Sequence, residues 1–193
     1  MRVHINNIIV RRQNVVSKSD YKDYRQELRE DFCCICGYCG KSEKITKNAF
    51  EIDHFMPKSV APELEKEYSN LVYSCYTCNR KKSDKWPTKD KSKCNDGFIG
   101  FVDPASEDYD NHLTRLDDGT IKGITEVGKY MCDIVFKFQM RPMRELWLCT
   151  KILERQEQLE EKILQMTTEE SKEYIKLNVE LKKLTALLFT KRE

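Results

Sequence analysis

Hydrophobic and polar positions alternate in two short segments of the N-terminal half of the chain. Residues 49–55 alternate well enough for a β-strand, and Pro57 stops regular strand pairing directly afterwards. Residues 71–74 predict a second short strand, and residues 78–84 predict a helical turn or short helix. The resulting order is strand, loop, strand and helix. A unit of this size cannot bury a hydrophobic core alone, so we expect an additional clamp at its ends.

A segment whose apolar residues recur with helical periodicity precedes this unit. Ser19 can cap a helix, and apolar side chains then recur at spacings of three and four, which predicts an amphipathic helix ending near Asp31. These apolar positions are Tyr21, Tyr24, Leu28 and Phe32. Residues 1–17 begin with an interrupted apolar run and then turn basic, which predicts an extended arm or an edge strand.

The pattern after the strand and helix unit predicts further short strands. Residues 85–96 are a polar, lysine-rich connector, and residues 97–104 predict a short strand that ends at a proline. Residues 113–121 contain the Asp-Gly pair that is typical of a β-hairpin. We expect these elements to extend the sheet of the first unit.

From Thr125 onward the pattern is helical. Thr125 can cap a helix whose apolar face consists of Val127, Met131, Ile134, Val135 and Phe138. Pro142 then marks a break or a new first turn, and residues 143–166 continue as a charged helix. A capping box from Thr167 to Glu170 opens a last helix, so the two long helices predict a helical hairpin. Their narrow leucine stripes fit packing within the chain or docking on a partner, and the sequence does not separate these alternatives.

The composition fits an intracellular protein and excludes a membrane protein. Of the 193 residues, 39% are hydrophobic and 34% are charged, which suits highly charged helices around one core. No apolar run approaches the roughly 20 residues that a membrane span needs, and the apolar run of the N-terminal arm is too short and too polar for a secretion signal. We therefore expect a cytoplasmic protein, whose cysteines stay reduced and bind metal more often than they form disulfides.

Two Cys-x-x-Cys pairs predict a zinc site. The second pair is Cys75 with Cys78, whereas the first is either Cys36 with Cys39 or Cys33 with Cys36. Cys36 with Cys39 is favoured, because Gly37 and Gly40 permit the tight, positive-φ backbone of a zinc knuckle. Four thiolates fill the tetrahedral coordination of zinc, so this metal is expected to be structural and the chemistry must come from other residues.

Asp53, His54 and Asn79 are the candidates for that chemistry. Asp53 and His54 lie at a strand end and Asn79 on the following helix, so that a carboxylate and an amide oxygen could share Mg²⁺ or Mn²⁺. Adjacent strand residues point to opposite faces, which leaves His54 free to act as a general base. Taken alone, a histidine in this position is more often a satisfied core residue than a catalytic one.

A basic run follows these residues. It includes Arg80, Lys81, Lys82 and Lys85. Such a local excess of positive charge is typical of a surface that binds a phosphate backbone, and the alternative is a merely solvated basic loop.

The complete arrangement resembles the HNH endonuclease family, whose ββα-metal finger is combined here with zinc-binding cysteines. The resemblance rests on Cys36-x-x-Cys39-Gly40, Ile52-Asp53-His54-Phe55-Met56-Pro57-Lys58-Ser59, Ser69-Asn70-Leu71-Val72 and Cys75-x-x-Cys78-Asn79-x-x-Lys82-Ser83-Asp84. It implies a metal-dependent endonuclease of DNA, with His54 as general base and Asp53 and Asn79 as magnesium ligands. It also implies that the amide of Asn70 ties the loop across the finger and helps to hold His54. The family often has histidine where this chain has Asn79, and the asparagine variant favours magnesium.

The segments outside the finger are similar to bacterial HNH proteins that accompany an ATPase in anti-phage defence systems of the Septu type. These segments are Phe101-Val102-Asp103-Pro104, Tyr109-Asp110-x-His112-Leu113 and Thr125-Glu126-x-Gly128-Lys129-Tyr130. The resemblance implies that an ATPase partner docks on the C-terminal helices. Two other functions remain open: a non-catalytic zinc module that binds DNA or protein, and an assembly subunit in which the helices matter most.

Together these features predict an α+β fold, with a ββα-metal finger clamped by a four-cysteine zinc site, a small β extension and a C-terminal helical region. We expect three segments. Residues 1–32 form the N-terminal arm and helix, residues 33–124 form the nuclease core with the zinc site and β-hairpin, and residues 125–193 form the helical region for packing or partner docking.

Overall fold

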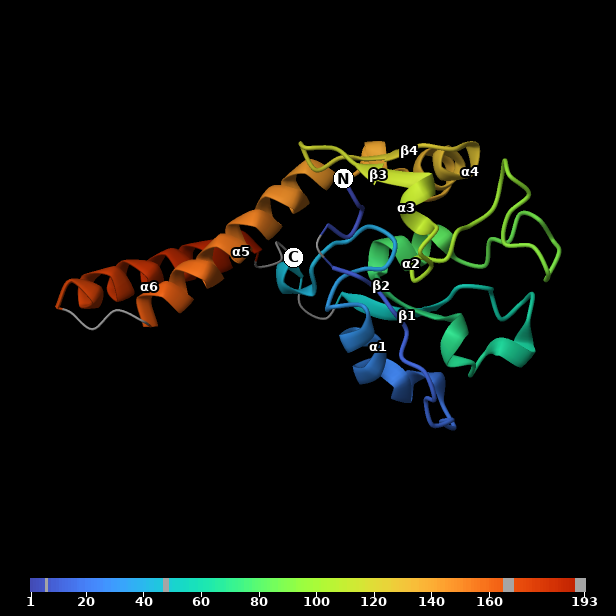
Figure 1. The fold of residues 1–193 in the computed structure, drawn as a ribbon, viewed down its shortest axis with the longest axis horizontal. Coiled ribbons are helices and arrows are strands. Elements are labelled where there is room, and N and C mark those ends of the chain that lie inside the picture. Colours follow the sequence, from blue (N-terminus) through green and yellow to red (C-terminus); the bar gives the residue numbers. More distant parts are fainter. Residues whose placement is uncertain (6, 47–48, 165–168, 190–193) are drawn as a thin grey trace.

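A long helical hairpin projects from the rest of the protein (Figure 1). The computed structural model describes residues 1–5, 7–46, 49–164 and 169–189. The hairpin consists of α5 (Met143–Leu164) and α6 (Glu169–Phe189), and the remaining elements form a body of helices and small antiparallel sheets. This architecture confirms the α+β fold class.

The centre of the body is an antiparallel pair of strands followed at once by a helix. Strand β1 (Phe50–His54) pairs with β2 (Leu71–Cys75), in a register that places Phe50 opposite Cys75 and His54 opposite Leu71. Helix α2 (Tyr76–Lys82) begins directly after β2 and packs on both strands. The predicted order of strand, loop, strand and helix is confirmed. We call this unit, residues 50–82, the finger.

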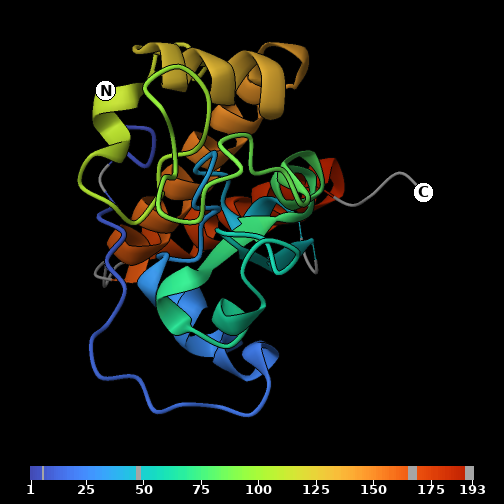
Figure 2. The same ribbon diagram turned by 90° about the vertical axis from the view of Figure 1, so that its right-hand side faces the viewer.

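The N-terminal segment covers the side of the finger opposite α2. A 3₁₀ turn, η1 (Tyr21–Tyr24), leads into α1 (Arg25–Asp31), which packs on β2. The cap is Asp20 rather than the expected Ser19, because the Asp20 carboxylate accepts the backbone N–H of Lys22 at 2.9 Å. Figure 2 shows the resulting layers, with α1 on one side of the finger and the later helix α4 (Glu126–Lys129) on the other.

The arm at residues 1–17 forms no strand among the residues that the structure describes, and a turn at residues 3–5 and a bend at residues 13–14 interrupt it. Its apolar side chains Val3 and Ile9 are buried in the body. Arg11 holds the arm in place by pairing with Asp103 through both nitrogens, at 2.7 and 3.0 Å, and by donating to the Leu71 carbonyl. The predicted edge strand is therefore not observed among the described residues: two backbone hydrogen bonds join Met1 to Arg115, and the other contacts of the arm with the body involve side chains.

The predicted hairpin forms, but in a sheet of its own. Strands β3 (Leu113–Arg115) and β4 (Ile121–Gly123) pair with each other and not with the finger, so the expected extension of the first sheet is wrong. The Asp-Gly turn is present, with Gly119 at a φ of +87°. A single helical turn, α3 (Tyr109–His112), leads into β3.

The predicted strand at residues 97–104 is also wrong. Gly97 and Gly100 take positive φ angles, and the Asp96 carboxylate accepts the backbone N–H groups of Phe98 and Ile99. These bonds fold the segment into turns, in which the alternation of apolar residues does not produce a strand. Only one isolated bridge, between Asn95 and Gly100, pairs backbone in this segment.

The helix after Thr125 is shorter than predicted. Thr125 caps α4 (Glu126–Lys129) by accepting the Gly128 N–H at 3.1 Å, as expected. The helix then continues with the wider turns of a π-helix, η5 (Tyr130–Val135). A short 3₁₀ helix, η6 (Phe138–Met140), follows. The wider turn changes which side chains share a face, and Ile134, expected in the apolar stripe, is 62% exposed.

The remaining short helices are 3₁₀ turns in the connections. They are η2 (Glu43–Ile45), η3 (Pro62–Leu64) and η4 (Tyr68–Asn70).

One hydrophobic core joins all parts of the body. It extends from Val3 in the arm to Met143 in the first turn of α5, and it includes the ring contacts of Phe136 with Tyr38, Phe101 and Phe138. This core draws on each of the three predicted segments. The division at residues 32 and 124 therefore stays a prediction.

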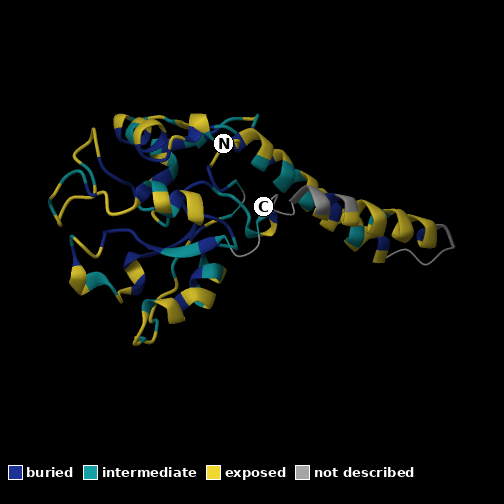
Figure 3. Cartoon of the chain, turned by 180° about the vertical axis from the view of Figure 1, so that it is seen from behind, coloured by how far each residue is buried: buried dark blue, intermediate teal, exposed yellow. Residues whose placement is uncertain are grey.

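The two helices of the hairpin pair through polar as well as apolar groups. Gln156 donates to Thr185 across the buried interface at 2.9 Å, and Lys182 pairs with Glu160. The hairpin is exposed along much of its length, whereas buried residues concentrate in the body (Figure 3). The predicted capping box at Thr167 lies outside the described residues. In the described part of the chain, no helix combines the length and apolar character needed to cross a membrane.

A substitution at Gly128 tests how closely α4 packs on the end of α3 and on β4. A Cβ atom at this position would lie 1.8 Å from the His112 carbonyl oxygen. We expect Gly128→Ala to lower the free energy of unfolding by about 2–3 kcal/mol, because the backbone on both sides must move. Urea denaturation measures this loss. Lys129→Ala, one residue along and exposed, is the matched control with an expected change within about 0.5 kcal/mol. Equal losses in both variants would contradict the close packing.

Candidate active site and metal centre

Four cysteines meet in the interior of the body. The Sγ atoms of Cys36, Cys39, Cys75 and Cys78 lie within 4.8 Å of one another, and all four residues are buried. The Cys39 and Cys75 Sγ atoms are 3.9 Å apart. Tetrahedral zinc with Zn–S bonds of about 2.3 Å separates its sulfur atoms by about 3.8 Å, so the cluster fits zinc. The predicted grouping is confirmed, and Cys33 is not part of it.

The first cysteine pair sits on a tight turn. The Gly40 N–H bonds to the Cys36 carbonyl at 2.8 Å, and Gly40 has a φ of +64°, as the zinc knuckle requires. Gly37 does not have a positive φ, so this part of the expectation is wrong. It is needed for space instead, because a Cβ atom there would lie 2.7 Å from the Phe32 ring.

The second cysteine pair spans the junction between β2 and α2. Cys75 is the last residue of β2, and Cys78 lies in the first turn of α2. The Gly37 N–H bonds to the Tyr73 carbonyl at 2.9 Å, which joins the knuckle to β2 beside the cluster. The four sulfur atoms thus connect the turn before the finger to the point where its strand becomes its helix.

Two arginines approach the cluster from the later part of the chain. The Arg141 guanidinium lies 3.2 Å from the Cys78 Sγ, and 3.8 and 3.9 Å from those of Cys39 and Cys75. Arg115 donates to the Cys39 carbonyl at 2.6 Å. Four thiolates around Zn²⁺ carry two net negative charges, and a guanidinium in this position offsets part of that charge.

The Asp53 carboxylate is buried between a tyrosine and a lysine. Tyr38 donates to Asp53 Oδ2 at 2.5 Å, and Lys82 Nζ lies 3.3 Å from the same oxygen. Burial raises the pKa of Asp53, and the nearby charge of Lys82 opposes that rise. Burial likewise lowers the pKa of Lys82, whose side chain has no exposed surface. Lys82 also donates to the His54 carbonyl at 2.6 Å, so it links the two residues of the Asp53-His54 pair.

The His54 side chain points to the other face of β1. Its Nε2 lies 2.9 Å from the Glu65 carbonyl oxygen, and its ring packs edge-on against Tyr21 at 4.6 Å. Burial lowers the pKa of His54, so the neutral imidazole predominates near pH 7. One nitrogen is therefore fixed by a backbone partner, and the orientation of the ring is set.

The Asn79 side chain faces a carboxylate that the sequence patterns did not single out. Its Nδ2 donates to Glu51 Oε2 at 2.5 Å, and the Glu51 Oε1 atom lies 3.6 Å from Arg80. Glu51 precedes Asp53 by two residues and shares its face of β1, a spacing that could have identified it from the sequence. No hydrogen bond among the described residues joins Asn79 to Asp53.

The Asn70 side chain ties two segments of the connecting loop together. Its Oδ1 accepts the Met56 N–H at 2.8 Å, and its Nδ2 donates to the Met56 carbonyl at 3.0 Å and to the Leu64 carbonyl at 3.3 Å. Asn70 thus holds the chain that leaves β1 beside the chain that enters β2. Glu65, the partner of His54, directly follows Leu64.

The basic residues after Asn79 divide into two groups. Arg80 and Lys85 are exposed and Lys81 is half-buried, with Arg80 over the Tyr76 ring at 5.0 Å. Lys82 faces inward and cannot contact a phosphate at the surface, which departs from its expected place in the basic run. Lys82 is buried because it lies about one helical turn after Asn79 and therefore shares the face of α2 that packs on β1.

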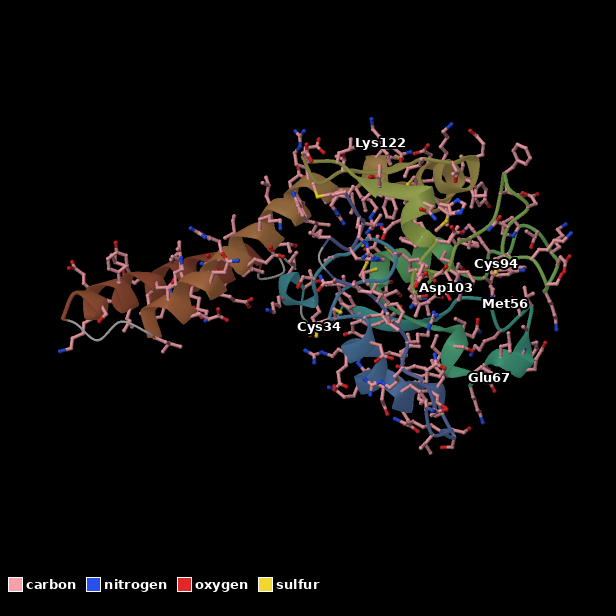
Figure 4. The ribbon with its side chains drawn as sticks, viewed as in Figure 1. Cys34, Met56, Glu67, Cys94, Asp103 and Lys122 are labelled. Atoms are coloured by element: carbon pink, nitrogen blue, oxygen red, sulfur yellow. The ribbon has the colours of Figure 1, made fainter. Side chains whose placement is uncertain are left out.

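Five further cysteines lie outside the cluster. Cys34 and Cys94 are on opposite sides of the body (Figure 4), and Cys94 is exposed. Cys132 is buried, while Cys33 and Cys149 are partly exposed. Among the described residues, none of these five thiols belongs to the four-cysteine cluster.

The oxygen atoms beside α2 are of the kinds that a hard divalent cation prefers, although the Asp53 carboxylate is already engaged by Tyr38 and Lys82. Asp53 and Glu51 offer carboxylates, and Asn79 Oδ1 has no hydrogen-bond partner among the described residues. Carboxylate and amide oxygens suit Mg²⁺ or Mn²⁺, whereas the buried sulfur cluster suits zinc. The two sets of donors are distinct, although α2 contributes to both.

Comparison with known proteins gives two similarities. Residues 36–85 match the HNH endonuclease family, which confirms the family resemblance of the cysteine pairs and the finger. The chain is also 28% identical over 126 residues to the Septu protein PtuB of Bacillus thuringiensis. That similarity covers 64% of this chain and 45% of the relative, so the chain matches less than half of the relative's length.

Loss of one cluster ligand tests the structural role of the metal. We expect Cys75→Ser to abolish stoichiometric zinc binding and to unfold the finger, because structural zinc supplies about 10–16 kcal/mol in comparable sites. Metal analysis together with circular dichroism measures both effects. Cys94→Ser, at an exposed thiol, is the control and should change neither. Chelation of Mg²⁺ alone should leave the fold intact, and a collapse would contradict the separation of the two sites.

The buried Lys82 pair gives a second test. Lys82→Met leaves the buried Asp53 carboxylate without its cation, and we expect the free energy of unfolding to fall by about 3 kcal/mol. The matched control, Lys81→Met, should change it by less than about 0.5 kcal/mol. Adding Asp53→Asn to Lys82→Met should recover part of the loss in urea denaturation. If the double variant is additive, the two side chains do not stabilise each other.

Proposed function

We propose that the protein is a divalent-cation-dependent endonuclease that hydrolyses phosphodiester bonds of DNA. The observation that carries the proposal is that β1 presents a neutral and oriented imidazole on one face and a separate set of hard oxygen donors on the other. The HNH similarity of residues 36–85 supports the same reaction class. Zinc in the four-cysteine cluster would hold the finger together and take no part in hydrolysis.

In the proposed reaction His54 acts as the general base. The neutral imidazole accepts a proton from a water molecule, whose oxygen attacks phosphorus in line with the leaving 3′ oxygen. The P–O3′ bond breaks and O3′ takes a proton from solvent, so that the products are a 5′-phosphate and a 3′-hydroxyl. Asp53 and Asn79 would hold Mg²⁺ or Mn²⁺, which supplies stabilisation of the negative charge on the phosphate and leaving oxygen.

The remaining residues would position the catalytic ones and the substrate. The hydrogen bond from His54 Nε2 to the Glu65 carbonyl leaves Nδ1 as the nitrogen that accepts the proton. Asn70 supports this arrangement by binding the loop that carries Glu65. Arg80, Lys81 and Lys85 would contact the phosphate backbone, while Lys82 is reserved for Asp53.

We further propose that the protein is the effector nuclease of a cytoplasmic anti-phage defence system. The similarity to a Septu protein supports this role. In the proposed assembly, an ATPase partner docks on the hairpin of α5 and α6, whose exposed apolar side chains include Leu148, Ile152 and Tyr174. Activation of the nuclease would then reside in that partner.

A non-catalytic zinc module that binds DNA or protein is the second candidate. It is favoured by one observation, the direct pairing of Asp53 with Lys82, which engages a carboxylate that the nuclease needs for its cation. The two candidates differ in whether phosphodiester bonds are broken at all.

Substitution of the proposed base separates them. We expect His54→Ala to lower the rate of plasmid cleavage in Mg²⁺ by about 10²–10⁴-fold, since a general base contributes that much. Gel analysis of plasmid conversion, with and without the native partner, measures the rate. His112→Ala is the histidine control, because His112 lies at the end of α3 and bonds to Thr125 and Asp108 rather than to the finger. Equal cleavage by His54→Ala and the unmodified protein would refute the role of His54, and no cleavage by either would favour the binding module.

A further inference from the structure

Glu51 has no role in the reaction as proposed so far, yet it is the hydrogen-bond partner of the Asn79 side chain. Its carboxylate accepts the Asn79 Nδ2 hydrogen at 2.5 Å, and its second oxygen lies 3.6 Å from the Arg80 guanidinium. The Glu51 side chain is 33% exposed. Its backbone is fixed in β1, where it lies opposite Ser74 of β2. Glu51 is therefore held in place from both its main chain and its side chain.

We propose that Glu51 is a positioning residue that orients the Asn79 amide so that Oδ1 faces the cation. This inference rests on the proposed function, because it concerns the same oxygen-donor site. An asparagine amide presents a donor on one side and an acceptor on the other, and the two sides have nearly the same shape. Only the acceptor side can bind Mg²⁺ or Mn²⁺.

The chemistry of the carboxylate determines which side of the amide it meets. An ionised carboxylate has no hydrogen to donate, so the Asn79 amide must turn its NH₂ group toward Glu51. Oδ1 then points away from Glu51, and it has no other hydrogen-bond partner among the described residues. Without Glu51 the amide could rotate, and the NH₂ group would face the cation for part of the time.

The position of Glu51 relative to Asp53 supports the same role. The two carboxylates lie two residues apart on one face of β1, and their partners Asn79 and Lys82 lie three residues apart on the facing side of α2. The strand and the helix therefore contact each other through two polar pairs, Glu51 with Asn79 and Asp53 with Lys82. Glu51 thus holds the side chain of Asn79, and Lys82 holds that of Asp53, which are the two proposed cation ligands.

The test compares two substitutions of Glu51 in the zinc-loaded full chain. Glu51→Gln offers a donor as well as an acceptor, so it no longer dictates which side of the Asn79 amide it meets, whereas Glu51→Met removes the hydrogen bond altogether at similar size. We expect Glu51→Met to weaken Mn²⁺ binding by about 10-fold or more, as for other groups that orient a metal ligand, and Glu51→Gln to weaken it by about 3-fold or more. Electron paramagnetic resonance of free Mn²⁺ measures binding without relying on cleavage.

A second background reverses the expected sign. Asn79→Asp offers two equivalent oxygens that need no orientation, and it places a second carboxylate against Glu51. In that background Glu51→Met should strengthen Mn²⁺ binding or leave it unchanged, rather than weaken it. Zinc content and the urea midpoint, measured in parallel, show whether each variant is folded.

The outcomes separate this inference from the proposed function. Weakening by Glu51→Met in the Asn79→Asp background as large as in the otherwise unmodified chain would mean that Glu51 acts through its charge, and no weakening by either Glu51 variant in the otherwise unmodified chain would mean that it has no role; both overturn the inference alone. The expected pattern without any DNA cleavage would support the inference and overturn the nuclease function. Failure of the unmodified protein to bind Mn²⁺ would overturn both.

Discussion

The four-sulfur cluster is the constraint on which the body of the protein depends. It joins Cys36 and Cys39, on a turn after α1, to Cys75 and Cys78, at the junction of β2 with α2. A two-stranded sheet with one short helix buries too little surface to hold itself together. Zinc in this cluster would bind the ends of that sheet to the rest of the core. The positions of β1 and of the polar residues on it follow from that attachment.

The interface between β1 and α2 combines stability with candidate chemistry. A strand face and a helix face normally meet through apolar side chains, but here they meet through the pairs Asp53 with Lys82 and Glu51 with Asn79. Burying charges in this way costs desolvation free energy, which their mutual attraction and hydrogen bonds offset in part. Polar residues at such an interface contribute less apolar packing than hydrophobic ones would, as is typical of functional sites. His54, on the other face, is kept apart from both pairs.

Much of this arrangement could be predicted from the sequence, because it depends on spacing. The cysteine pairs, the two strands of the finger and the Asp-Gly hairpin follow from local rules about metal ligands, alternation and turns. The burial of Lys82 and the partnership of Glu51 with Asn79 depend on the phase between a strand and a helix, which no local pattern specifies. The π-helix at Tyr130 and the turns near Gly97 are cases in which backbone geometry overrides an apolar pattern. The separation of the two sheets is likewise a matter of tertiary packing.

Arg141 connects the projecting hairpin to the sulfur cluster through its guanidinium. It stands two residues before α5 begins, and its guanidinium touches sulfur atoms from both cysteine pairs. Helix α5 has 22 residues, which corresponds to a length of about 33 Å. The body also holds α5 further along, because Arg144 pairs with Asp118 and Glu157 pairs with Lys44. The sulfur cluster that holds the finger is therefore linked through Arg141 to a helix that the body fixes at several points along its length.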